Sequence, residues 1–254
     1  MTATAVRPTG LIPTPRAAAD DTATRTIAQD PATSDPGGRA VAYQRVLHQL
    51  VRRELRLLAD LAGWAPADEE LRTTTLTRHA ELIGRVLLHH HAVEREAVWP
   101  ALLRVTPAPA RTAVDDWSAR CARIDHMLRD VGTAGRQWRV ACAEPARAAF
   151  AAACRALADE VDAQTAEEER TLLPLLGAHL AAEDWVAIAA GSRCRLSGPE
   201  QLFVLGLALE DSCASDRARL IGGLPWSVRV SWRLYGRRCH RVAVVRLRGA
   251  PPAA

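Results

Sequence analysis

Lysine is absent from this sequence of 254 residues, and all 33 basic residues are arginines. We attribute this to a coding bias toward Ala and Arg, not to a functional demand. Aromatic residues are also scarce, at 4% of the chain, which disfavours a β-sandwich because strands favour aromatic and β-branched side chains. Ala, Leu and Arg dominate instead, and these residues favour helices. Hydrophobic residues still make up 48% of the chain, so the composition predicts a helical protein with a real core.

Net charge, cysteine spacing and the lack of long apolar runs narrow the class of protein further. The formal net charge of +4 is mild and does not by itself call for a nucleic-acid or membrane partner. None of the six cysteines belongs to a C-x-x-C pair, so neither a zinc ribbon nor a thioredoxin-type motif is indicated. The chain has no run of about 18 apolar residues, and its N-terminus lacks the apolar core of a secretory signal. We therefore expect a cytoplasmic protein without a transmembrane segment.

The distribution of apolar residues predicts three parts. Residues 1–38 are rich in Ala, Thr, Pro and Asp without periodicity, and we expect a disordered tail. Residues 39–190 contain four stretches with helical periodicity, joined by short links, which predict an all-α, antiparallel up-down four-helix bundle. Residues 191–254 form a C-terminal helical extension, which we expect to dock on the bundle. The four stretches cover about 41–62, 68–103, the segment after the Pro107/Pro109 loop, and 145–180.

The C-terminal extension carries its own pattern. Helices are predicted at 199–210 and 214–222, and a third begins at Pro225. The Val-rich segment 242–247 is compatible with a helix or with extended chain. The third helix is Arg-rich, which leaves contact with anionic lipid or nucleic acid open. We expect instead that its apolar face docks on the bundle and that its arginines face solvent.

A unit of two helices occurs twice in the bundle segment. In each unit, two polar residues four positions apart are followed by a proline, ten positions after the first of them. A further residue precedes each pair by 42 or 43 positions. The first unit contains His48, His90, Glu94 and Pro100, and the second contains Cys121, Gln164, Glu168 and Pro174.

Helical phase directs four of these side chains toward the interior. Residues four apart on a helix lie about 40° from each other, so His90 and Glu94 point the same way, along the apolar stripe. His48 and Glu168 lie on the apolar stripes of their own helices. Ionised carboxylates are costly in an apolar interior unless they are paired or bind a metal. We therefore predict that His48, His90, Glu94 and Glu168 are the ligands of a metal ion, a set that suits Fe(II), Mn(II) or Zn(II).

The segment His89-His90-His91-Ala92-Val93-Glu94, followed by Trp99-Pro100, resembles the second-helix motif of hemerythrin-like HHE cation-binding domains. The resemblance covers roughly residues 40–190. It implies a non-haem di-iron centre in which each half of the bundle supplies one lone His and one His-x-x-x-Glu pair. Carried over, His48 is the lone His of the first half, His90 and Glu94 are its pair, and Glu168 is the Glu of the second half. The segment Leu202–Arg248 is similar to extensions on bacterial members.

Two positions depart from the pattern of this family. Gln164 replaces the His of the second pair, and Cys121 replaces the second lone His. His126 is a poor substitute for Cys121, because it lies about 140° round the helix from it, among charged residues. Cys121 itself is more typical of a small buried hydrophobe than of a ligand. We predict that the second half has lost its terminal ligands and that the protein holds one metal ion tightly, not two.

The remaining histidines are predicted to lie away from the metal. His89 and His91 are expected at the surface, His79 too far along its helix to share the ion, and His179 at a helix end. The predicted ligands also have simpler interpretations that involve no metal. His48 alone could be a core histidine, and Glu168 lies in an acidic run, 167–169, that could form a solvated face.

The sequence leaves three functional hypotheses. The first is a non-enzymatic iron-binding protein that senses or binds O2, NO or redox state, with one or two Fe ions, or Zn or Mn in their place. The second is a metal-free, degenerate scaffold that acts as a protein-interaction module, with no particular protein partner indicated. The third is a metalloenzyme, such as a peroxidase-like activity at an open iron position. Metal content separates the first from the second, and turnover of peroxide separates the third from both.

Overall fold

The computed structural model describes residues 36–106, 109–192 and 194–249. Every regular element in these ranges is a helix and no strand occurs in them, so the all-α prediction is confirmed. The predicted tail lies outside the described residues except for residues 36–38, where the first helix already begins.

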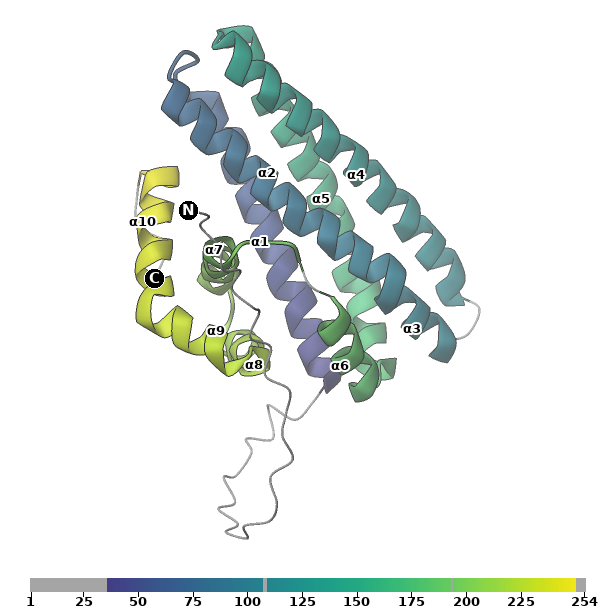
Figure 1. Cartoon of the computed structure of the whole chain (residues 1–254). Helices are drawn as coiled ribbons and strands as arrows, with labels where there is room; N and C mark the ends of the chain where they lie inside the picture. The colour runs from purple at the N-terminus through teal and green to yellow at the C-terminus, as the bar shows by residue number, and fades with distance from the viewer. Residues whose placement is uncertain (1–35, 107–108, 193, 250–254) are drawn as a thin grey trace, which may run out of the picture.

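Four long helices form a bundle (Figure 1). They are α1 (Pro36–Trp64), α2 (Glu70–Val93), α4 (Pro109–Ala141) and α5 (Glu144–His179). Both α1 and α4 pack against α2 and α5, so the four helices enclose one interior. The antiparallel order of the helices stays a prediction.

The first helix extends beyond its predicted end. Gly63 lies inside α1, which ends at Trp64. The guanidinium of Arg147 on α5 donates to the carbonyl oxygens of Ala62, at 2.6 Å, and of Gly63. Because these bonds satisfy two carbonyls that a helix end leaves open, the neighbouring helix stabilises the last turn.

A short additional helix follows the four long ones, mostly within the range predicted as the bundle. α6 (Ala182–Gly191) begins after a break at Leu180 and Ala181 and contacts α1. Its buried Ile188 and half-buried Trp185 pack against the apolar cluster at that end of the bundle. The ring of Trp185 also lies 5.5 Å from the ring of Tyr43 on α1, measured between centroids.

The apolar core is divided into two clusters by a layer of buried polar residues. On α1 the two clusters lie on either side of Gln44 and His48, and on α5 on either side of Gln164 and Glu168. The same division falls at His90, in the last turn of α2, and at Glu94, just after it. Three helical segments therefore bring polar side chains to one level of the bundle, with apolar packing above and below.

The regular elements in the described part of the extension are all helical. Its elements are α7 (Gly198–Glu210), α8 (Ala214–Gly223), α9 (Trp226–Ser231), the π-helical turn η3 (Trp232–Gly236) and α10 (Arg237–Arg248). The helical alternative for 242–247 is therefore correct. A capping box formed by Ser197 and Glu200 begins α7. Helices α7 and α8 contact α1, while α10 packs on α7 (Figure 1). The division into tail, bundle and extension stays a prediction.

Substituting Gly206 with Ala is expected to lower the free energy of unfolding by about 1–3 kcal/mol. Gly206 on α7 faces the ring of His240 on α10, and an added Cβ would lie 2.2 Å from its Cδ2 atom. The ring cannot move freely, because its Nε2 lies 3.0 Å from a carboxylate oxygen of Glu210. Urea unfolding measures the effect. Gly222→Ala in α8, where nothing lies within 4 Å of the added Cβ, is the control, and equal stabilities of the two variants would contradict the expectation.

Candidate metal centre

The four predicted ligands lie together in the polar layer. His48, His90, Glu94 and Glu168 each offer one nitrogen or oxygen atom, and these four atoms lie within 4.8 Å of one another. All four side chains are buried. The structure thus brings the four residues together, while their binding of a metal stays a prediction.

An irregular turn places Glu94. The predicted second helix is divided into α2, the π-helical turn η2 (Glu94–Val98) and α3 (Trp99–Val105). The N–H of Trp99 donates to the carbonyl oxygen of Glu94, five residues back, as a π-turn requires. Pro100 lies in the first turn of α3, and because it has no N–H it cannot continue the i→i−4 hydrogen bonds at this point. The irregularity therefore falls beside the candidate ligand.

His48 lies between the carboxylate of Glu168 and that of Glu169, which is not one of the four predicted ligands. Its Nε2 lies 3.3 Å from Oε2 of Glu168, and its Nδ1 lies 3.3 Å from Oε1 of Glu169. Glu169 also accepts a hydrogen bond from Arg52. A carboxylate on the far ring nitrogen is the usual way to orient a metal-binding histidine. Glu169 therefore has the position of a residue that orients His48.

His90, the second histidine of the centre, lies against the carboxylate of Glu94. The ring centroids of His48 and His90 are 5.5 Å apart. Nε2 of His90 lies 3.4 Å from Oε1 of Glu94, one helical turn away. The same oxygen of Glu94 accepts a hydrogen bond from Gln44, at 3.2 Å.

Burial controls the protonation of these groups. Burial and the proximity of His48 hold the pKa of His90 well below its usual value. Burial also raises the pKa of Glu94 well above its usual value, and the nearby Glu168 adds to this. For His48, burial lowers the pKa, but Glu168 and Glu169 outweigh it and the net direction is upward. These directions fit a cation site, because neutral imidazole is the metal-binding form of histidine and a cation would favour the ionised form of Glu94.

Several buried atoms at the centre lack a hydrogen bond among the described residues. They include Oε2 of Glu94, Oε2 of Glu168 and Nε2 of His48. Buried polar atoms are normally satisfied, so a group of unsatisfied acceptors at one point needs an explanation. A divalent cation held by two imidazoles and two carboxylates accounts for these acceptors, and the donor set fits such an ion.

In the second half of the layer, a glutamine amide bridges two polar groups. The amide of Gln164 donates to Oε1 of Glu168, at 2.7 Å, and to Sγ of Cys121, at 3.1 Å. Cys121 is fully buried, and burial raises its pKa, so its thiol stays protonated. The amide therefore joins these groups without a second cation.

Two residues of this layer are not among the predicted ones. Gln44 lies one turn before His48 on the same stripe, and this phase is a signal that identifies it. Glu169 has no such signal, because in the sequence it is only part of an acidic run. His91 was predicted at the surface, which is wrong. It is 1% exposed, and its Nδ1 lies 2.6 Å from Oδ1 of Asp125 on α4. Because α2 packs between α1 and α4, more than one of its faces is buried.

The other histidines lie apart from the cluster. His126 is exposed. His79 is buried against Glu54, with 2.8 Å between its Nε2 and a carboxylate oxygen. His89 is half-buried, and His179 ends α5.

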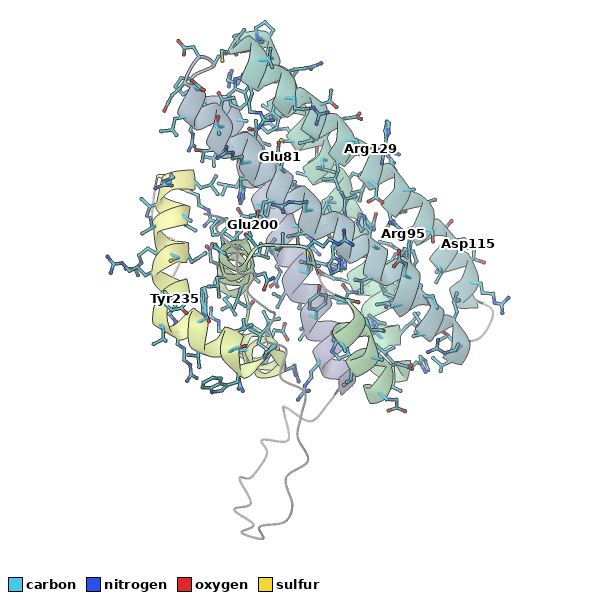
Figure 2. All side chains as sticks on the ribbon, viewed as in Figure 1. Glu81, Arg95, Asp115, Arg129, Glu200 and Tyr235 are labelled. Atoms are coloured by element: carbon cyan, nitrogen blue, oxygen red, sulfur yellow. The ribbon has the colours of Figure 1, made fainter. Side chains whose placement is uncertain are left out.

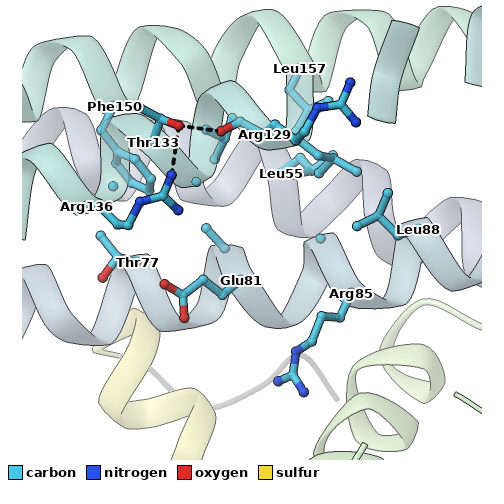
Figure 3. A pocket seen from close by; sticks show the side chains of 16 residues that line it. Leu55, Thr77, Glu81, Arg85, Leu88, Arg129, Thr133, Arg136, Phe150 and Leu157 are labelled. Atoms are coloured by element: carbon cyan, nitrogen blue, oxygen red, sulfur yellow. Dashed lines mark hydrogen bonds between the residues drawn. The ribbon is translucent and has the colours of Figure 1, made fainter. Parts of the chain in front are cut away.

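A groove between α2 and α4 is separate from the candidate centre (Figure 3). It has a volume of about 560 Å³, and buried Leu55, Phe150 and Leu157 form part of its lining. Arg136 donates to Thr133 at its edge, at 2.9 Å. None of the four candidate ligands lines it.

The length and composition of the described helices can be compared with those of membrane-spanning helices. No single helix among them is long and apolar enough to cross a bilayer. The bent pair formed by α5 and α6 passes the same test of length and composition when the two are taken together.

A helical bundle with two imidazoles and two carboxylates in one buried layer defines the class of carboxylate–histidine metal-binding bundles. Residues 39–176 match the family model of the hemerythrin HHE cation binding domain. This match covers more than half of the chain, so the protein belongs to the hemerythrin HHE family. Neither the curated proteins nor the solved structures include a significant match to the chain.

Proposed function

We propose that the protein binds one iron ion through His48, His90, Glu94 and Glu168 and acts, without being an enzyme, as a sensor or binder of O2, NO or redox state. The convergence of four buried ligand atoms within 4.8 Å of one another carries this proposal. A bound iron ion supplies a redox-active centre with coordination positions that a small molecule can occupy. A cytoplasmic location belongs to the same proposal.

The residues of the chain prepare the site for one cation. Glu94 and Glu168 come from different helical segments and would share the charge of the ion between them. Gln44 and Gln164 each hold one oxygen of these carboxylates, at 3.2 and 2.7 Å, which leaves the other oxygen free. The apolar clusters on both sides of the layer exclude water. This arrangement supports a single ion.

The test is elemental analysis of protein purified without chelators and of protein reconstituted anaerobically with Fe(II). We expect about one iron per chain in the wild type and none in His90→Ala. The exposed His126→Ala is the matched control and should keep its iron. Protein with no metal after reconstitution would contradict the proposal and favour the metal-free scaffold, whose support is that Gln44 and Gln164 already satisfy part of the layer. Turnover of peroxide by iron-loaded protein would show an enzyme instead.

Glu169→Gln is expected to weaken iron binding about 10- to 100-fold without removing a ligand. The carboxylate attracts the Nδ1–H of His48 and so directs Nε2 toward the centre, whereas an amide can turn its NH2 group to that nitrogen. Competition with a chromophoric chelator measures the affinity. Glu167→Gln is the control, because the neighbouring Glu167 pairs with Arg170 on the outside. Equal affinities in the two variants would show that Glu169 does not orient His48.

A further inference from the structure

The charge of the chain is divided unevenly along its length. No Asp or Glu follows Asp216, whereas nine arginines do. Residues 217–254 therefore carry +9, and residues 1–216 carry 24 basic and 29 acidic residues, or −5. The small net charge of the whole protein conceals a strongly basic C-terminal segment, and such asymmetry is typical of a surface that binds an anionic partner.

The basic segment is one nearly continuous helical region, which we call the C-terminal arm: α9, η3 and α10, Trp226–Arg248. Its inner face is fixed to the rest of the protein. Trp232, Val244 and Leu247 are buried there. Arg248 donates to Glu54 on α1, at 2.6 Å, and to Glu210 on α7, at 2.7 Å. These contacts set the rotation of the arm, so the opposite face must point outward.

The outer face of the arm combines positive charge with exposed apolar side chains. Figure 2 shows Tyr235 at the edge of the molecule opposite to Asp115 of α4. Five arginines on the arm are exposed, and none of them pairs with a carboxylate among the described residues. They are Arg233, Arg237, Arg238, Arg241 and Arg246. Between them lie exposed apolar residues: Trp226 (72%), Leu234 (71%), Tyr235 (53%), Val242 (53%) and Val245 (41%).

We propose that this outer face binds the surface of an anionic lipid bilayer, with the helix axis parallel to the membrane plane. Arginines attract anionic headgroups, and each one near the surface adds about 1 kcal/mol, or a factor of about five in affinity. Leu234, Val242 and Val245 enter the boundary between headgroups and acyl chains, which is what an interfacial helix requires of its apolar residues. Such side chains gain little from a phosphodiester backbone, so the same face is poorly suited to nucleic acid. The bundle remains outside the bilayer.

The experiment is cosedimentation of the full-length protein with vesicles of phosphatidylcholine alone, or with 30% phosphatidylglycerol, at 0.1 M salt. We expect binding to the anionic vesicles and little to the neutral ones. The triple variant Arg237→Gln, Arg238→Gln, Arg241→Gln should bind the anionic vesicles on the order of 100-fold more weakly. The control removes the same charge from the bundle, by Arg120→Gln, Arg123→Gln and Arg155→Gln, all exposed there, and should lose much less binding.

A second variant separates lipid from nucleic acid. Leu234→Ser with Val242→Ser should reduce vesicle binding at least tenfold and leave any binding to single-stranded RNA or duplex DNA unchanged. Circular dichroism verifies that each variant keeps its helices. The proposal is overturned if wild-type protein binds neutral and anionic vesicles equally, binds neither, or binds nucleic acid more tightly than anionic vesicles. It is also overturned if the control loses as much binding as the arm variant.

Discussion

Replacing Cys121 and Gln164 together by His is expected to raise the iron content from about one ion per chain toward two. The two positions belong to the half of the layer where the amide of Gln164 donates hydrogen bonds to Glu168 and Cys121. In the protein as it stands, a second ion would find a neutral amide oxygen, which is a weak ligand for iron, and a thiol that burial keeps protonated. Two imidazoles in their place restore the terminal ligands of the family pattern.

The measurement combines elemental analysis with near-ultraviolet absorption after anaerobic loading and oxidation. Only the double variant should show the bands of a bridged ferric pair. Its control, Cys239→His with Gln137→His, adds two histidines at exposed positions of α10 and α4 and should stay near one iron. Wild-type protein that already holds two irons would refute the argument. A double variant that stays at one iron would show that the second half lacks more than these two ligands.

The sequence predicted most of the centre because a helix's phase follows from its apolar stripe. His48, His90, Glu94 and Glu168 all lie on such stripes, and in the structure they meet. The phase of one helix does not say what lies opposite, which is why His91 was misplaced. It is buried because Asp125 on a different helix offers a partner at 2.6 Å. Burial of a polar side chain depends on such complementary pairs between helices.

The irregular backbone at Glu94 could not be predicted from the sequence either. A proline interrupts the hydrogen bonds of a helix, but the form of the interruption before Pro100, a π-helical turn at Glu94, depends on how the preceding carbonyl groups find other donors. The docking of the extension depends on contacts over long sequence separations. Glu54 and Arg248 are 194 residues apart, and neither carries a local signal of the other.

Glu54→Gln is expected to lower the free energy of unfolding by about 3 kcal/mol at neutral pH, the largest loss of stability that we expect from the removal of one charge. Glu54 is fully buried on α1. One of its oxygens lies 2.8 Å from His79 Nε2, and the other accepts hydrogen bonds from Arg53 and Arg248, at 2.8 and 2.6 Å. Burial alone would raise its pKa, but these partners outweigh burial and lower it to about 2.

The sign of the pH dependence follows from that lowered pKa. Unfolded chains have the ordinary value of 4.5, so the ionised carboxylate stabilises the fold fully above about pH 4.5 and loses its effect as the pH falls toward 2. The difference in unfolding free energy between wild type and Glu54→Gln should therefore shrink over this range, measured by urea unfolding of chelator-treated proteins so that metal release does not contribute. Asp60→Asn, on the same helix but 69% exposed and 3.6 Å from Arg155, should cost less than about 1 kcal/mol at any of these pH values. A difference for Glu54→Gln that stays constant from pH 7 to pH 2 would show that the loss comes from packing, and that the buried charges do not hold the extension on the bundle.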